Sequence, residues 1–273
     1  MSFEYTTPAI VKWKLDDFMD AIDQFEDSLA RKTHHQMFVG KDYQAILIHI
    51  SGKSILTARE LLTLCAHGYP DGALSLGRNL YEQMMIVAFF ETHKNDIDFQ
   101  EYVDDFFLSY EVQRNKCLRN ITKYLSDVAN DLYSEKERLK KQTNQQIKSD
   151  YWWARCDNFS HLVDCVVKAQ ADDDIRQFLG VHYARYKRAC LSLHASCIGN
   201  SNRIGHATGF EVVDTSPTGY GHSGPLIFAA ISLISITGFI SAAFQIDNTK
   251  SLKQLNELAI FYQEQETKDT III

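Results

Sequence analysis

An arginine and a glutamate four residues apart, Arg78 and Glu82, interrupt the otherwise apolar stretch SLGRNLYEQMM (75–85). At this spacing the two side chains share one face of a helix, together with Leu74 and Met85. Burying two charges is costly unless both are paired and hydrogen-bonded. The pair is therefore either an intrahelical ion pair that stabilises the fold or part of a polar cavity, in which Glu82 meets His194 or Tyr186 from a later helix. The sequence leaves both interpretations open.

A second group of polar residues, Tyr186, Ser192 and His194, lies in the stretch YKRACLSLHAS (186–196). An imidazole titrates near neutral pH and can pass a proton to a leaving oxygen, so His194 is a candidate general acid or base. A histidine at the end of a helix is also a common cap that the helix dipole stabilises. Both interpretations of His194 stay open.

The charge distribution around this group is uneven. The chain has 28 basic and 35 acidic residues and a net charge of −7, which excludes a general polyanion binder, yet no acidic residue lies between Asp174 and Glu211. The basic and imidazole residues of this segment are Arg176, His182, Arg185, Lys187, Arg188, His194, Arg203 and His206. The segment is either a local anion-binding surface or a solvated helix face beside a loop. The candidate substrate contacts are Tyr186, Ser192, Arg203, His206 and Arg185.

Helices must position these residues, because apolar side chains recur with helical spacing along most of the chain. The expected helices cover residues 14–31, 42–67, 70–93, 96–118, 121–148, 160–169, 173–194, 225–246 and 251–266. We predict one all-α domain over residues 1–273, a bundle of about eight to ten helices. Its central helices would be 70–93, 181–196 and 225–246, with a possible break at Gly180. Helices 14–31 and 251–266 would be peripheral.

The stretch GPLIFAAISLISITGFISAAFQ (224–245) holds 22 residues without a charge, which is the length of a membrane span. Small residues at intervals of three (Ser232, Ser235, Gly238, Ser241) suit close helix contact, and flanking Lys/Arg anchors are missing. We therefore favour a buried core helix over a membrane span.

The six cysteines form no C-x-x-C pair and no recognisable series of metal ligands, and the N-terminus does not read as a signal peptide. We expect a cytoplasmic protein with reduced cysteines, no metal site and no cofactor.

Three segments together resemble a family of helical bacterial proteins of unknown function, over about residues 40–245. They are LCAHGYPDGALSLGRNLYEQMMIVAFF (64–90), YWW (151–153) and YKRACLSLHAS (186–196). The marks of the family are an Arg-x-x-x-Glu helix and a Tyr-x5-Ser-x-His helix. Such proteins are also similar to HEPN proteins, helical ribonucleases of toxin and antiviral systems that use an Arg-x4–6-His motif.

The HEPN resemblance implies a metal-independent endoribonuclease of a bacterial defence or toxin system. In it, His194 would act as acid or base, Arg188 would hold the scissile phosphate, and Arg78 with Glu82 would position the histidine. RNA would be the substrate and supply its own 2′-hydroxyl as nucleophile; a protein encoded by a neighbouring gene would be a partner, and the chain would form homo-oligomers. The Arg-x5-His spacing alone is weak evidence, because it recurs at Arg155–His161 and Arg176–His182. The alternative is a non-catalytic helical scaffold or sensor that binds a partner or a small anion.

Overall fold

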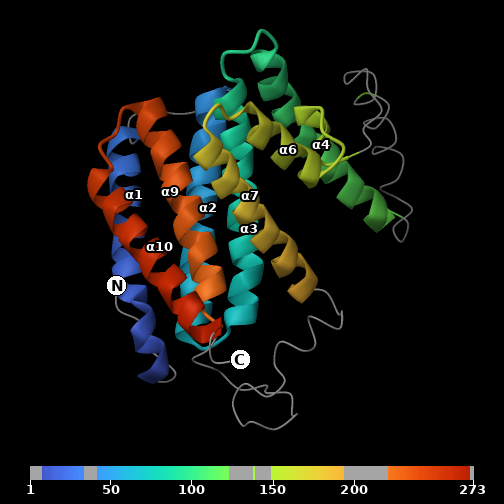
Figure 1. The fold of residues 1–273 in the computed structure, drawn as a ribbon. Coiled ribbons are helices and arrows are strands. Elements are labelled where there is room, and N and C mark those ends of the chain that lie inside the picture. Colours follow the sequence, from blue (N-terminus) through green and yellow to red (C-terminus); the bar gives the residue numbers. More distant parts are fainter. Residues whose placement is uncertain (1–7, 34–41, 123–137, 139–148, 194–220, 271–273) are drawn as a thin grey trace.

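The computed structural model describes residues 8–33, 42–122, 138, 149–193 and 221–270, which are almost entirely helical (Figure 1). The helices are α1 (Leu15–Thr33), α2 (Tyr43–Ala66), α3 (Pro70–His93), α4 (Phe99–Thr122), α6 (Phe159–Ala169), α7 (Asp173–Leu193), α9 (Ser223–Phe244) and α10 (Thr249–Thr270), with 3-10 segments η1 (Pro8–Trp13) and η3 (Trp152–Ala154). No β-strand occurs in these ranges. The prediction of an all-α bundle is confirmed, while the expected helix 121–148 lies mostly outside the described residues.

A tight turn joins α2 to α3 and makes the two helices an antiparallel hairpin. Gly68 takes a left-handed conformation (φ +80°), which a residue without Cβ adopts at little cost. Its N–H donates to the carbonyl of Cys65 (3.0 Å), and the N–H of Tyr69 donates to that of Leu64 (2.9 Å). Pro70 then begins α3, where its missing N–H and fixed φ suit the first helical position. The turn sets the direction of the helix that carries Arg78.

Helices α3 and α9 lie at the centre of the bundle, as predicted (Figure 1). They pack closely at Gly77 of α3, where an added Cβ would lie 3.1 Å from the Cβ of Phe228. The small residues of α9 contribute less to close contact than expected: Ser232 is fully buried, but an added Cβ at Gly238 would meet no atom within 4 Å. Gly77 of α3 therefore lets the two helices pack closely, whereas Gly238 of α9 does not.

Helix α9 is long and apolar enough to span a membrane by length and composition (mean hydropathy 2.2). It is nevertheless mostly buried, because it packs between α3, α2 and α10. Its buried residues run from Ser223 to Phe244 and include those on all sides of the first three turns. This packing favours the interpretation of α9 as a buried core helix. Its apolar composition is compatible with that interpretation, because the central helix of a bundle can be as apolar as a membrane span.

Helices α1 and α10 lie along one side of the bundle (Figure 1) and contribute to the same core. The Tyr262 hydroxyl donates to the Trp13 carbonyl (2.9 Å), and the Ser251 hydroxyl donates to the Ala21 carbonyl (2.9 Å). Tyr262 and Trp13 are fully buried. Buried side chain–backbone hydrogen bonds therefore fasten α10 to α1 at Ala21 and to η1 at Trp13.

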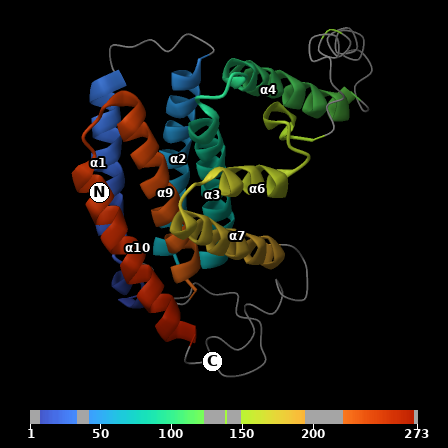
Figure 2. The same ribbon diagram turned by 45° about the horizontal axis from the view of Figure 1, so that its top comes forward.

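Helix α4 and η3 lie on the opposite side from α1 and α10 (Figure 2). The Trp153 ring stacks on Phe90 with centroids 5.2 Å apart, and the rings of Phe89 and Phe106 approach it edge-on at 5.4 and 5.0 Å. Such aromatic contacts stabilise beyond the area they bury. This cluster fixes the YWW segment on the end of α3.

Helix α7 differs from the prediction in two respects. It runs without a break through Gly180, where an added Cβ would meet no atom within 4 Å. It covers α3 from outside rather than lying at the centre, and Phe178, Val181 and Leu191 expose apolar surface. Periodicity alone did not distinguish a central helix from one that is buried on one side.

Candidate functional site

Arg78, Glu82 and Tyr186 meet where α7 crosses α3, and we call these three residues the Arg78 cluster. The Nε of Arg78 lies 3.3 Å from Oε1 of Glu82. The Tyr186 hydroxyl donates to the same oxygen at 2.7 Å. The Arg78 guanidinium also lies over the Tyr186 ring, 5.8 Å from its centroid, within the range of a cation–π contact. The predicted contact between the Arg-x-x-x-Glu helix and Tyr186 is thus present.

The Arg78 cluster is partly open to solvent. The side chains of Arg78 and Glu82 are 33% and 25% exposed, whereas Tyr186 is 7% exposed. Burial is the largest single influence on the pKa of Arg78 and lowers it, but the charge of Glu82, together with the smaller contributions of Tyr186, Cys190 and the hydrogen bond to Glu82, raises the pKa overall. Burial, together with the hydrogen bond to Glu82, raises the pKa of Tyr186 well above its ordinary value. At neutral pH Arg78 is therefore a cation and Tyr186 a neutral phenol.

Aromatic side chains surround Tyr186. Its ring centroid lies 5.4 Å from that of Tyr81, 4.8 Å from that of Phe159 and 5.9 Å from that of Tyr183. Tyr81 is fully buried, and among the described residues its hydroxyl has no hydrogen-bond partner. These rings hold Tyr186 in place and so fix the carboxylate of Glu82 that it contacts.

Tyr151, which the sequence did not identify as a site residue, borders the Arg78 cluster. Burial raises its pKa, and the charges of Glu82 and Asp150 add to the effect, while Arg78 opposes it. Its ring lies 5.5 Å from that of Phe159. The signal was present in the YWW segment, but two tryptophans beside a tyrosine indicate packing more readily than a site.

Chemically, the Arg78 cluster offers a positioned guanidinium and a carboxylate. The only described polar side chain that pairs with the Arg78 guanidinium is Glu82, through Nε. The terminal nitrogens of Arg78 therefore have donors to offer a ligand such as a phosphate oxygen. Glu82 can accept a further hydrogen bond, for example from an imidazole. Tyr186 positions Glu82 and does not act as a base, because its pKa is raised.

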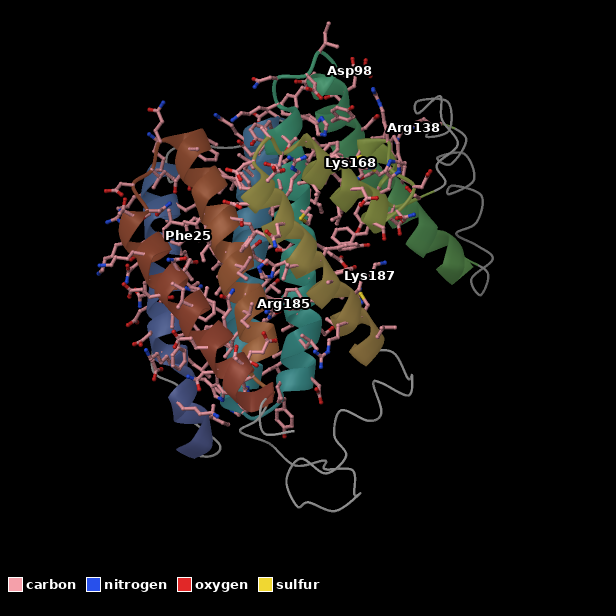
Figure 3. The ribbon with its side chains drawn as sticks, viewed as in Figure 1. Phe25, Asp98, Arg138, Lys168, Arg185 and Lys187 are labelled. Atoms are coloured by element: carbon pink, nitrogen blue, oxygen red, sulfur yellow. The ribbon has the colours of Figure 1, made fainter. Side chains whose placement is uncertain are left out.

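The other basic residues of α7 have different neighbours; Figure 3 labels two of these residues, Arg185 and Lys187. The Arg185 guanidinium pairs with Glu266 of α10 at 2.7 Å. The Lys187 ammonium donates to the hydroxyl of Ser160 at 3.1 Å and lies over the Tyr183 ring. Arg188 is exposed, and it comes two residues after the buried Tyr186, so it lies on nearly the opposite side of the helix. The structure does not bring Arg185 or Arg188 to the Arg78 cluster.

His182 lies inside the protein rather than on an anion-binding surface. It is 3% exposed, its Nδ1 has no partner among the described residues, and its ring contacts that of Phe178 at 4.4 Å. Burial, together with the charge of Arg185, lowers its pKa to about 4. His182 is neutral at pH 7, so the acid-free segment carries less positive surface than the sequence suggested.

The remaining predicted residues are His194, Arg203 and His206, which lie outside the described residues, and Ser192, whose backbone belongs to α7 but whose side chain is not described. The two other Arg-x5-His pairs are separated from the Arg78 cluster by their own contacts. Arg155 is held by Asp98 and Glu101 at 2.8 and 2.5 Å. Neither Arg155–His161 nor Arg176–His182 therefore replaces the predicted pair.

Comparison with known proteins identifies the family. No curated protein and no solved structure matches the chain. A family model described as a family of unknown function (DUF5677) matches residues 44–211, which is more than half of the chain. The matched range contains α2, α3 and α7, and with them the whole Arg78 cluster; it ends before α9. The resemblance to a helical family of unknown function is confirmed: the chain belongs to the DUF5677 family.

Proposed function

We propose that the chain is a HEPN-like, metal-independent endoribonuclease of a bacterial defence or toxin system, acting in the cytoplasm, and that the Arg78 cluster is the fixed part of its site. The observation that carries this proposal is the state of Arg78. Its guanidinium is oriented by Glu82 and the Tyr186 ring, while its terminal nitrogens pair with no described side chain. A preoriented guanidinium of this kind binds a phosphate with little loss of side-chain entropy.

The position of the Arg78 cluster supports the same proposal. It lies against α7, most of which belongs to the acid-free segment and whose C-terminal end leads directly to the part of that segment with His194, Arg203 and His206. In the proposed reaction the RNA 2′-hydroxyl attacks the adjacent phosphorus, and the bond to the 5′-oxygen breaks. His194 moves the proton from the 2′-hydroxyl to the 5′-oxygen. Glu82 orients the imidazole of His194 by accepting a hydrogen bond from its ring. The products are a 2′,3′-cyclic phosphate and a 5′-hydroxyl.

The structure changes the role that we give to Arg188. Because Arg188 is exposed on the side of α7 away from Tyr186, we assign the phosphate at the reacting bond to Arg78. Arg188 would contact a neighbouring phosphate of the same strand. Its removal should weaken RNA binding and make the remaining binding less sensitive to salt, with a smaller effect on the cleavage step.

The alternative is a non-catalytic scaffold or sensor, and a specific observation favours it. Arg78, the proposed phosphate ligand, and Arg185, a candidate substrate contact, already face carboxylates in Glu82 and Glu266. Such pairs leave little net positive charge at the surface. A protein built in this way would bind a partner or a small anion without cleaving RNA.

The test is RNA cleavage by purified wild type, His194→Ala and Arg188→Ala, alone and with the product of any neighbouring gene. The substrate is a fluorescent single-stranded RNA, and a matched RNA with one 2′-deoxynucleotide at the cleaved position is the control. We expect His194→Ala to lower the rate at least about 10²-fold, as for other acid–base groups. The deoxy substrate should resist cleavage, and cleavage of the RNA by wild type should persist in chelator. Circular dichroism checks that each protein keeps its fold under the conditions of the assay.

Two results would reject the ribonuclease. Wild type that leaves RNA intact with every neighbouring gene product supports the scaffold instead. Folded His194→Ala that cleaves at the wild-type rate removes the proposed acid–base group.

A further inference from the structure

A second group of reactive side chains lies at the start of α6. Cys156 precedes the helix, and His161 and Cys165 lie one turn apart on it. One ligand atom from each of the three residues lies within 4.8 Å of the others. The sequence alone did not indicate this group, because a C-x4-H-x3-C spacing becomes recognisable only when the helix begins between the first two ligands.

The distance between the two sulfur atoms fits a metal better than a disulfide. The Sγ atoms of Cys156 and Cys165 lie 3.8 Å apart. Two thiolates bound at about 2.3 Å to one tetrahedral Zn²⁺ ion are separated by about 3.8 Å. A disulfide requires a separation of about 2.05 Å. The two sulfurs are therefore already placed as two corners of a tetrahedron.

The backbone around Cys156 is held in this position by several hydrogen bonds. Its N–H donates to the Tyr151 carbonyl at 3.2 Å, and its carbonyl accepts from the Ser149 hydroxyl at 2.5 Å. The Asn158 side chain caps α6 by accepting from the N–H of His161 at 3.0 Å. Cys156 and the first turn of α6 thus have a fixed geometry before any ion binds, which lowers the cost of binding.

His161 is oriented toward the same loop. Its Nδ1 accepts from the N–H of Asp157 at 3.3 Å and lies 3.8 Å from the Asp157 carboxylate. The lone pair of a ring nitrogen is thus directed at the start of α6. The side chain is 46% exposed, so a small rotation of the ring can bring it to the roughly 3.6 Å from sulfur that a shared tetrahedral ion requires.

We propose that Cys156, His161 and Cys165 bind one thiophilic divalent transition-metal ion, with Zn²⁺ as the physiological candidate, and that Asp157 or water completes the coordination. Two soft thiolates and an imidazole select such an ion over Mg²⁺ or Ca²⁺. Binding breaks both S–H bonds and releases two protons to solvent. It also ends the hydrogen bond that the Cys156 thiol donates to the Ala154 carbonyl at 3.3 Å.

The metal would fasten the loop before α6 to the helix. Trp153, three residues before Cys156, is buried in the aromatic cluster with Phe89, Phe90 and Phe106. Binding should therefore stabilise the chain against unfolding. The metal site shares no residue with the Arg78 cluster. A result that rejects the metal site would therefore not contradict the proposed ribonuclease activity.

The test uses the full chain, reduced with a phosphine and stripped of metal by dialysis against chelator. Co²⁺ is the first probe, because thiolate ligands give it a charge-transfer absorption that oxygen ligands do not. We expect one equivalent of Co²⁺ to produce this band, one equivalent of Zn²⁺ to abolish it, and Zn²⁺ to raise the unfolding temperature. The affinity for Zn²⁺ is measured by competition with a chromophoric chelator.

Single-ligand variants and matched controls locate the site. Cys156→Ser and Cys165→Ser should lose the charge-transfer band. His161→Ala should weaken Zn²⁺ binding at least tenfold, the lower end of the roughly 10–100-fold loss typical even of residues that only support a metal ligand. Cys190→Ser and His67→Ala remove a thiol and an imidazole elsewhere and should bind like wild type. Circular dichroism confirms that each variant is folded.

Three results would overturn the proposal. One is a folded, reduced wild type that gives no charge-transfer band with Co²⁺. Another is an unchanged band in folded Cys165→Ser. The third is chain purified without reductant or oxygen that carries no zinc and has Cys156 and Cys165 joined in a disulfide, as shown by mass spectrometry.

Discussion

The two sides of α3 are built on different principles. Toward α9, Gly77 allows the backbones to approach, and an added Cβ would come within 3.1 Å of the Cβ of Phe228. Toward α7, Arg78 and Glu82 keep about a third and a quarter of their surface in solvent while the buried Tyr186 contacts both. The α9 side has no room for extra volume, whereas the α7 side has polar groups that a ligand can reach. Substitutions on the α9 side should therefore lower stability through steric overlap. Substitutions on the α7 side should act through the loss of polar groups.

The largest effect is expected on the α9 side. Gly77→Leu inserts a side chain where even a Cβ is crowded by Phe228 and the Pro225 carbonyl. It should lower the free energy of unfolding by about 3 kcal/mol or more, through overpacking. Chemical denaturation monitored by circular dichroism measures the loss.

Gly52→Ala is the matched control for Gly77, because an added Cβ at Gly52, in the interior of α2, meets no atom within 4 Å. It should stabilise the chain by about 0.5–1 kcal/mol, the difference in helix propensity. A Gly77→Leu variant as stable as wild type would show that α3 and α9 do not pack as closely as described.

An intermediate effect is expected from the buried histidine of α7. The pKa of His182 falls from 6.5 to about 4 on folding, so the unfolded chain binds a proton more readily. Stability should therefore be lost as pH falls from about 6.5 towards 4, by about 2 kcal/mol at pH 5 relative to pH 7.5. Above pH 6.5 this group should have almost no effect.

Urea unfolding of wild type and His182→Leu at pH 7.5 and pH 5 separates the contribution of His182 to the pH dependence of stability from that of the carboxylates. His182→Leu should lose about 2 kcal/mol less than wild type on acidification, and His67→Leu, a control in the exposed turn after α2, should behave like wild type. An equal acid sensitivity in wild type and His182→Leu would place His182 in contact with solvent.

A smaller effect is expected on the α7 side. In a double-mutant cycle, Tyr186→Phe and Glu82→Ala should show a coupling of about 1 kcal/mol, the value of one hydrogen bond. Glu82→Gln keeps an acceptor for the Tyr186 hydroxyl and should retain most of the stability. The Arg78–Glu82 pair itself should contribute only about 0.5 kcal/mol, because both side chains are partly solvated.

A coupling near zero between Glu82 and Tyr186 would mean that the hydroxyl does not donate to the carboxylate. A loss of several kcal/mol in Glu82→Gln would instead identify the Arg78 cluster as a structural element, buried more deeply than its exposure indicates.

The sequence predicted the helices well where the signals were local. The HGYPDGA turn, with a glycine in the left-handed region and a proline at the first helical position, placed the start of α3 at Pro70. The Arg-x-x-x-Glu spacing placed Arg78 and Glu82 on one face and suggested the contact with Tyr186. Such features depend on a few adjacent residues, so periodicity and turn chemistry suffice.

Features that depend on tertiary packing could not be predicted in the same way. His182 was counted with the basic residues, although packing of α7 buries it. The grouping of Cys156 with His161 and Cys165 depends on where α6 begins, and the contact between Arg185 and Glu266 joins residues far apart in the chain. A linear spacing does not specify which side of a helix another element will cover.

The most direct test of whether the Arg78 cluster is a functional site compares two arginines. Arg78→Met removes the guanidinium of the cluster, and Arg59→Met removes one that pairs with Asp23 and Glu26 on the other side of the hairpin, with similar exposure. RNA cleavage and the free energy of unfolding are measured for both. We predict that Arg78→Met lowers cleavage at least about 10²-fold, as loss of a transition-state donor does, with less than about 1 kcal/mol lost in stability. Arg59→Met should cleave like wild type. Equal cleavage by wild type and both variants, or no cleavage by any, would contradict the account.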